Sequence, residues 1–319
     1  MIAASAVATT WRRRAGRVFA TLMVAGCGGE SPSLQAGQVL LATSAGSAAA
    51  CRVVDVGRPL PAEARESSGL ARSRRDPSIL WTHNDAGNEP VLFAVSASGG
   101  LAGRVRVEGA TLEDWEDIAA APCANGHCLY VGDIGDNDAA RNSITVYRIE
   151  EPAPDAGSAG PATAMRAKYG GGARDAEALF VVGGRVYIVT KGRTGPIELY
   201  RFPTAAAGRE AATLEELGRL LPAPKSSADR VTAAAASPDG RWVGIRTYRT
   251  LRLYRAASLT GGTGAREAAV TMDLGPLKEA KGEGLAMADD GTVWLSSEAA
   301  KKSPPSLARL HCALPDSES

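Results

Sequence analysis

Ile144-Thr-Val-Tyr-Arg148 is the first of three full copies of one pattern, in which two apolar residues alternate with a variable one before Tyr-Arg. The other two are Ile197-Glu-Leu-Tyr-Arg201 and Leu251-Arg-Leu-Tyr-Arg255, and Phe93 and Ala308 mark the tyrosine position of two weaker copies. The tyrosine positions 93, 147, 200, 254 and 308 are 54, 53, 54 and 54 residues apart. Near-equal steps of this length are typical of a repeat protein in which each repeat is one supersecondary unit.

Two other elements precede each copy of the pattern: first a segment rich in small residues, and then an apolar run. The segments begin at Ser68, Glu116, Glu177, Thr232 and Glu283, and the runs are ILWT (79–82), CLYVGD (128–133), RVYIVT (185–190), RWVGIR (241–246) and TVWLSS (292–297). Glycine-containing turns such as SPDG and DDG separate segment from run, as in β-hairpins. Four short strands in about 50 residues are typical of a propeller blade. The sequence therefore predicts an all-β, five-bladed β-propeller, with six blades as the alternative.

The last repeat supplies only three strands, so its fourth strand is expected from Cys51–Val56, which would close the ring by pairing with the last blade. Apart from Cys27, the chain has four cysteines, and an even number in an exported chain implies disulfides. Cys123 and Cys128 flank a predicted hairpin, which leaves Cys51 to pair with Cys312. Free thiols and the two other pairings remain open.

The first 27 residues indicate export. A basic stretch (Arg12 to Arg17) precedes a short apolar segment that ends in Val24-Ala25-Gly26-Cys27, which resembles the lipobox of bacterial lipoproteins. We therefore expect a signal peptide at 1–26, a lipid on Cys27, a flexible tether at 27–50 and the propeller at 51–315. By resemblance to known sorting rules, Gly28 after the cysteine favours the outer leaflet or outer membrane. The lipid is the only contact with a membrane that we expect.

Composition excludes one class of partner. Lys and Arg total 36 against 35 Asp and Glu, which gives a formal net charge of +1. A nucleic-acid-binding protein carries a marked positive excess. The partners expected are instead a polar small molecule, a glycan or an envelope protein.

Polar residues gather at equivalent positions of the repeat, just before the first strand and just after the second. Because the first strand of a blade leaves one face and the second returns to it, these residues should share one face, which is expected to hold the functional site. The ligand or catalytic candidates are His83, Asn84, Asp85, Glu116, Asp117, Glu177, Lys191, Arg246, Glu283 and Glu298. The alternative is that these carboxylates and cations are structural salt bridges.

The loop GDIGDND (132–138) has the highest density of oxygen ligands in the chain. Calcium prefers carboxylate, amide and carbonyl oxygens, so the metal candidates are Asp133, Asp136, Asn137 and Asp138. A turn stabilised by side-chain bonds to its own backbone is the competing interpretation. Calcium is thus a possible cofactor, and no other cofactor is required by the sequence.

Three stretches carry a resemblance: SGLARSRRDPSILWTHNDAG (68–87), DWEDIA (114–119) and LYVGDIGDN (129–137). They resemble a family of exported bacterial propellers of unassigned chemistry. More distantly, Glu283-Gly-Leu-Ala and Asp290-Gly-Thr-Val-Trp are similar to phytase-like and gluconolactonase-like propellers, a resemblance that implies calcium and hydrolysis of phosphoesters or lactones. Only the blade pattern matches, so no catalytic residue is carried over.

Two functions are consistent with this sequence, and it leaves open whether the protein is an enzyme. The first is a lipid-anchored binding protein that holds a polar ligand or partner on one face without catalysis. The alternative is a calcium-assisted hydrolase of phosphoesters or lactones, in which Lys191 and Arg246 neutralise an anionic substrate.

Overall fold

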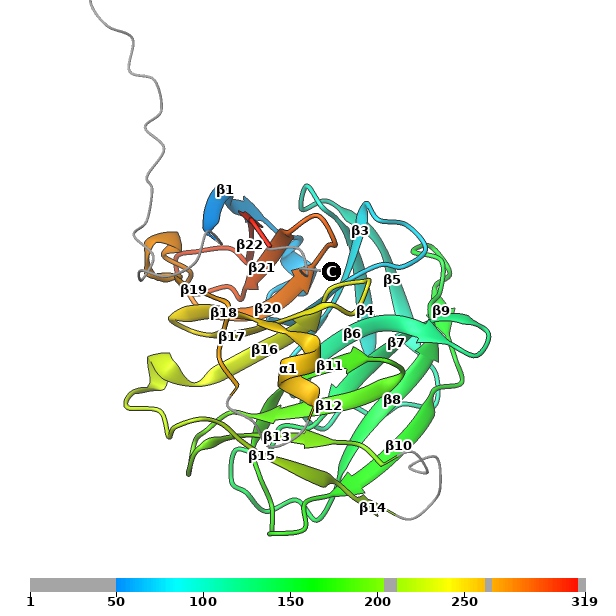
Figure 1. Ribbon diagram of the computed structural model, residues 1–319. Helices are drawn as coiled ribbons and strands as arrows, with labels where there is room; N and C mark the ends of the chain where they lie inside the picture. The colour runs from blue at the N-terminus through cyan, green and yellow to red at the C-terminus, as the bar shows by residue number, and fades with distance from the viewer. Residues whose placement is uncertain (1–49, 204–210, 262–265, 315–319) are drawn as a thin grey trace, which may run out of the picture. The chain divides into compact units, whose positions relative to one another are not determined.

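The computed structural model describes residues 50–203, 211–261 and 266–314, and the predicted five-bladed β-propeller is confirmed (Figure 1). Five sheets, each built mainly from antiparallel strands, follow one another along the chain. Their inner strands lie side by side in the order β2, β6, β11, β16, β20 and back to β2, so the ring is closed. The predicted signal peptide, lipidated Cys27 and nearly all of the predicted tether lie outside the described residues. No helix in the described part of the chain is long and apolar enough to span a membrane.

The first two blades contain five strands each. Blade 1 consists of β2 (Ser67–Arg72), β3 (Ile79–Asn84), β4 (Val91–Ser96), β5 (Leu101–Val107) and β9 (Ser158–Ala159). Blade 2 consists of β6 (Trp115–Cys123), β7 (Gly126–Asp133), β8 (Ile144–Glu150), β10 (Thr163–Lys168) and β14 (Ala212–Thr213). The sequence predicted four strands per blade. The short β9 and β14 are additions that pair in parallel with the outer strands β5 and β10, and so cover edge N–H and C=O groups that would otherwise stay unpaired.

The other three blades have the four predicted strands. Blade 3 consists of β11 (Ala176–Val182), β12 (Arg185–Thr190), β13 (Ile197–Arg201) and β15 (Glu215–Leu221). Blade 4 consists of β16 (Val231–Ala236), β17 (Trp242–Thr247), β18 (Thr250–Arg255) and β19 (Val270–Asp273). Blade 5 consists of β20 (Gly282–Met287), β21 (Thr292–Ser297), β22 (Ser306–Cys312) and β1 (Cys51–Pro59). The short helices are α1 (Ala256–Thr260), η1 (Ala62–Ala64), η2 (Ser227–Asp229) and η3 (Gly275–Leu277).

The apolar core lies between the blades. Five clusters of buried side chains fill the five junctions between neighbouring sheets. Alternate residues of one strand point to opposite faces, so Leu129 and Val131 of β7 pack toward blade 1 while Cys128 and Tyr130 pack toward blade 3. Because both faces are buried, the strands are apolar at consecutive positions, which is the run that the sequence shows.

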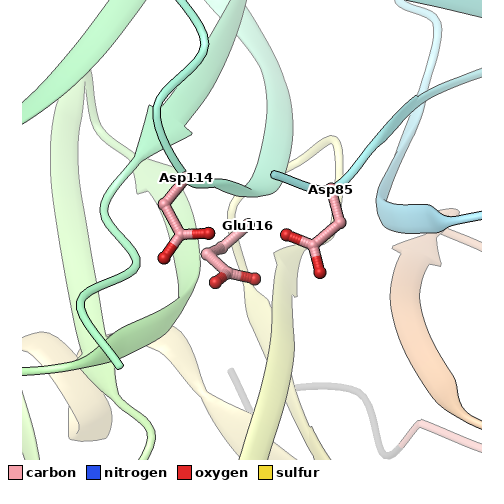
Figure 2. Close-up of side chains that lie close together, drawn as sticks. All are labelled: Asp85, Asp114 and Glu116. Atoms are coloured by element: carbon pink, nitrogen blue, oxygen red, sulfur yellow. The ribbon is translucent and has the colours of Figure 1, made fainter. Parts of the chain in front are cut away.

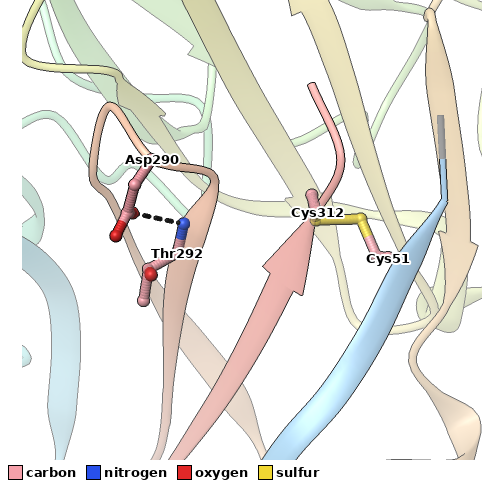
Figure 3. The surroundings of a disulfide bond; sticks show 4 residues. All are labelled: Cys51, Asp290, Thr292 and Cys312. Atoms are coloured by element: carbon pink, nitrogen blue, oxygen red, sulfur yellow. Dashed lines mark hydrogen bonds between the residues drawn. A yellow bond between two sulfur atoms is a disulfide. The ribbon is translucent and has the colours of Figure 1, made fainter. Parts of the chain in front are cut away.

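The predicted closure of the ring is confirmed. Strand β1 pairs antiparallel with β22, and Cys51 lies directly opposite Cys312 in the register. The two cysteines form a disulfide (Figure 3). The second predicted disulfide, Cys123–Cys128, links the two strands of the β6–β7 hairpin.

The strand register also brings the predicted polar positions to one face. The first residue of each inner strand pairs with the end of the second strand, as in Trp115 with Asp133, Ala176 with Thr190 and Gly282 with Ser297. Side chains that precede an inner strand therefore lie near those that follow the second strand. We call this surface the polar face.

Candidate functional site

Three glutamates occupy the same distorted position of three inner strands. Glu116, Glu177 and Glu283 each lie in a β-bulge, where the register of the first two strands of the blade shifts by a residue. A bulge redirects a side chain out of the regular alternation of the sheet. All three are almost fully buried, at 3%, 3% and 1% exposure. Their charges act on one another, Glu177 on Glu116 and Glu283 on Glu177. We call these three carboxylates the acidic ring.

Two lysines lie within this acidic ring. Lys191 follows β12, and its Nζ contacts Oε1 of Glu177, with Oδ2 of Asp175 at 3.9 Å. Lys281 precedes β20, and its Nζ lies 3.0 Å from Oε1 of Glu283 and 2.8 Å from Oε1 of Glu298. Each lysine therefore already has carboxylate partners from its own blade.

Asp85, Asp114 and Glu116 form a second group at the junction of blades 1 and 2, where their carboxylates face one another (Figure 2). One oxygen from each lies within 4.8 Å of the others. Gly135 makes room for this group, because a Cβ at that position would collide with carboxylate oxygens of both Glu116 and Asp114. Three carboxylate oxygens at this separation could bind a metal ion.

Burial shifts the proton affinity of these groups. It raises the pKa of Asp114 to about 6, and the negative charges of Asp85 and Asp175 add to the effect. It also raises the pKa of Glu116 well above its ordinary value, again with help from neighbouring carboxylates. Burial raises the pKa of Glu177 to about 8, even though Lys191 acts in the opposite direction. Like charges that are removed from water favour either protonation or a bound cation.

Asp117 has a different role from its neighbour Glu116. Its carboxylate is fully buried and accepts hydrogen bonds from the backbone N–H groups of Leu179 in β11, at 2.9 Å, and Ala234 in β16, at 3.0 Å. One side chain therefore joins the inner strands of blades 2, 3 and 4. The sequence predicted a ligand or catalytic residue here, and the structure places a link across the channel.

His83 and Asn84 are also buried at the end of β3. The ring of His83 packs edge-on against Trp115, with 5.6 Å between the ring centroids, and burial lowers its pKa to about 4, so the imidazole is neutral. Asn84 donates through Nδ2 to the carbonyl of Glu63 and accepts from the N–H of Glu66. These contacts hold the loop that carries Asp85.

Arg246, in β17 of blade 4, and Glu298, just after β21 of blade 5, both make contacts with residues of blade 5 or of the loop that leads into it. The guanidinium of Arg246 is fully buried and donates to the carbonyls of Gly284 and Ser296 and to the carboxylate of Glu279. It therefore clamps blade 4 to blade 5 rather than facing a ligand. Glu298 accepts from Lys281, and burial raises its pKa to about 7.

The four predicted metal ligands of the 132–138 loop do not form one cluster. The carboxylate of Asp133 contacts Arg141 and accepts from the N–H groups of Glu113 and Asp114. Asp136 accepts from the N–H groups of residues 140 and 141, Asn137 accepts from Arg193, and Asp138 is exposed. Their oxygens are used to build the loop, and the carboxylates that do converge are Asp85, Asp114 and Glu116.

A polar pocket of about 270 Å³ opens at the end of β12. We call it the blade 3 pocket, and the side chains that line it include Arg174, Asp175, Thr190, Arg193 and Glu198. The sequence did not single out Asp114, Asp175 or Glu198 as site residues. Asp114 and Asp175 each lie two residues before a ring glutamate, Glu116 or Glu177, so they share a repeat position of their own just before the inner strand. This equivalence is the signal that could have found them.

No family model matches the chain, and no curated protein matches it. Among solved structures, the PQQ-bound form of an aldose sugar dehydrogenase from Streptomyces coelicolor is 12% identical, with a TM-score of 0.51 over 85% of this chain and 100% of that chain. A glucose dehydrogenase is 11% identical, with a TM-score of 0.45 over 83% of this chain and 100% of that chain. At this identity the first likeness shows a shared propeller fold.

The sequence-based prediction of function is corrected by this finding. A solved structure that shares the fold is a sugar dehydrogenase, which supports neither a simple binding protein nor a calcium-assisted hydrolase of phosphoesters or lactones. The contacts of Lys191 and Arg246 agree with the correction, because both cations are engaged by carboxylates and cannot serve as the anion site that the hydrolase required.

The cations around the acidic ring do not suit PQQ, the quinone that the neighbour binds. PQQ carries three carboxylates and therefore needs cationic partners. Among the described residues, Lys191 and Lys281 of the ring and the nearby Arg141 and Arg246 each contact a carboxylate of the chain already. These residues do not fit a tricarboxylate, and no step is derived through it.

Proposed function

We propose that the polar face is the active site of a dehydrogenase-type enzyme, in which Glu177 takes the proton from a hydroxyl group of an aldose or a similar polyol. The observation that carries the proposal is the buried Glu177–Lys191 pair, in which Nζ of Lys191 also lies 3.9 Å from Oδ2 of Asp175, a residue that lines the blade 3 pocket. Support for the reaction class comes from the solved aldose sugar dehydrogenase that shares the fold.

The blade 3 pocket suits a polyhydroxylated substrate. A sugar hydroxyl both donates and accepts hydrogen bonds, so a sugar pocket needs donors and acceptors side by side. Arg174 and Glu198 form an ion pair in the pocket wall, and Arg193 donates to Asn137. The acceptor left for a sugar hydroxyl is Oδ2 of Asp175, which has no hydrogen-bond partner among the described residues. Asp175 also lies 3.9 Å from Lys191, so a hydroxyl held by this carboxylate would be near the Glu177–Lys191 pair.

Glu177 has the proton affinity that the reaction needs. Oxidation of an alcohol removes the proton from its oxygen and a hydride from its carbon, leaving a carbonyl. A carboxylate whose pKa is raised to about 8 by burial is a stronger base than an exposed one, and after it takes the proton its neutral form suits the buried site. Lys191 orients the carboxylate in its charged form. The hydride and its two electrons pass to a two-electron acceptor, which the assay supplies.

We further infer that a divalent cation occupies the carboxylates of Asp85, Asp114 and Glu116, and that it is calcium. The oxygen-only ligand set supports a hard cation. Bound there, the cation would offset the repulsion between the three carboxylates and could hold a substrate hydroxyl. The two disulfides support the expected location outside the cytoplasm, where such bonds persist.

The test is oxidation of a panel of aldoses by the full chain, with calcium and a panel of two-electron acceptors that includes PQQ, a nicotinamide and a redox dye. We expect Glu177→Gln to lower kcat by about 100-fold or more with little change in KM, because general-base catalysis typically contributes 10²–10⁴-fold. In the wild type, kcat/KM should rise about tenfold per pH unit up to a pH near 8, where Glu177 becomes ionised.

The matched control is Glu215→Gln, which removes a carboxylate that pairs with Arg201 on the outer part of blade 3. It should leave kcat unchanged. Oxidation that proceeds equally fast in Glu177→Gln would exclude Glu177 as the base, and a chain that oxidises no aldose with any acceptor would overturn the proposed function.

A further inference from the structure

A second pocket lies next to the blade 3 pocket, between blades 3 and 4. Gly192 lines the blade 3 pocket, and a Cβ at this position would collide with Ile197 and Pro224, which line the second pocket. The second pocket has a volume of about 260 Å³ and an apolar wall that includes Leu221. It lies outside the acidic ring.

The charge of this second pocket is opposite to that of the ring. Lys225, Arg249 and Arg252 line it, together with the single carboxylate of Asp229. Asp229 is engaged by Ser226, whose Oγ donates to its Oδ2 at 2.9 Å, and Arg252 donates to the hydroxyl of Thr250. We call it the cationic pocket.

Two of its three cations have no partner within the described chain. The side chains of Lys225 and Arg249 are exposed and make no hydrogen bond or ion pair with any described residue, in contrast to Lys191, Lys281 and Arg246 of the polar face. They stand at the rim of a concave, partly apolar surface. A ligand that fills such a surface gains apolar contact and charge pairing together.

We propose that the cationic pocket binds an organic anion, a carboxylate on an apolar body. The apolar wall of Ile197, Leu221 and Pro224 would receive the body, and Arg249 and Lys225 would pair with the carboxylate. The acidic ring repels the same ligand, so the two regions of this face select for opposite charge. This inference does not depend on the proposed dehydrogenase activity.

The test is isothermal titration of the full chain at low ionic strength with 2-naphthoate. Two control ligands separate the two contributions. The uncharged 2-naphthalenemethanol probes the apolar body alone, and inorganic phosphate probes the negative charge alone. We expect 2-naphthoate to bind at least tenfold more tightly than either probe, and added salt to weaken it. The double variant Lys225→Gln/Arg249→Gln should bind 2-naphthoate about tenfold more weakly.

Lys301→Gln/Lys302→Gln is the matched control, because it removes two exposed lysines from the loop after β21 in blade 5. It should leave the affinity unchanged. Equal affinity in the Lys225/Arg249 variant, equal binding of the uncharged probe, or no binding of 2-naphthoate at millimolar concentration would each overturn the proposal. Because the substituted side chains are exposed and unpartnered, thermal unfolding should match the wild type, which separates lost binding from lost folding.

Discussion

Asp114 and Asp138 both belong to stretches dense in carboxylates, and the structure gives them different surroundings. Asp114 faces Asp85 and Glu116 and is partly withdrawn from water, and its pKa is raised to about 6. Asp138 is exposed at the end of a loop whose other oxygens already accept hydrogen bonds. Only the first site therefore has a reason to bind a cation, since neutralising it removes a repulsion that water cannot screen.

This difference gives a prediction for calcium. After treatment with EDTA, added calcium at about 100 times its Kd should stabilise the wild type by about 2.7 kcal/mol, which raises Tm by several degrees. Asp114→Asn should abolish the rise, and Asp138→Asn should retain it, as measured by thermal unfolding of the full chain. If calcium still raised the Tm of Asp114→Asn but not that of Asp138→Asn, the ion would bind at the 132–138 loop instead.

At the scale of the element, neighbouring inner strands approach each other closely at the position that follows the bulge. A Cβ at Gly69 or Gly284 would collide with the neighbouring inner strand, so the position after the bulge must be small in blades 1 and 5, and it is alanine in blades 3 and 4. Blade 2 has Asp117 there instead. Its carboxylate extends across the channel and satisfies backbone N–H groups of two other inner strands.

Asp117 is therefore expected to be structural. Asp117→Ala should lower the free energy of unfolding by about 2–4 kcal/mol, because it removes the acceptor of three buried N–H groups, those of Ile118, Leu179 and Ala234. Asp117→Asn should cost less, since its amide oxygen can still accept from Leu179 and Ala234. Urea unfolding measures both. An unchanged free energy in Asp117→Ala would show that water or a shift of the strands replaces the carboxylate.

The repeat explains which parts of the site could be predicted from the sequence. Glu116, Glu177 and Glu283 share one repeat position, and a repeat that fixes the blade also fixes where each bulge lies. The meeting of Asp85 with Asp114 could not be predicted, because it depends on how two loops from different blades approach each other. The contacts of Arg246 with blade 5 could not be predicted either. The sequence places a cation at the end of a strand, but it does not tell whether the side chain faces a ligand or a neighbouring blade.

At the scale of the whole molecule, the closure of the ring decides stability. Four of the five blades are made from one continuous part of the chain, apart from the short added strands, whereas blade 5 takes β1 from the opposite end of the propeller sequence. β1 is an edge strand with two irregularities in its pairing to β22, and several of its side chains are exposed. Its pairing alone is therefore a weak closure, and the Cys51–Cys312 disulfide supplies what the pairing lacks.

The two disulfides should for this reason contribute very differently. Chain entropy gives about 5 kcal/mol for Cys51–Cys312, which spans 261 residues, and about 2 kcal/mol for Cys123–Cys128, which spans 5. Cys51→Ser/Cys312→Ser should therefore lower Tm by roughly 10 °C or more, and Cys123→Ser/Cys128→Ser by less than half as much. Hydrogen exchange should rise first in β1 and β22 of the former variant, because opening starts at the seam of the ring. If both variants lost equal stability, or if exchange rose evenly over all five blades, the ring would be held by the junctions between blades and not by its seam.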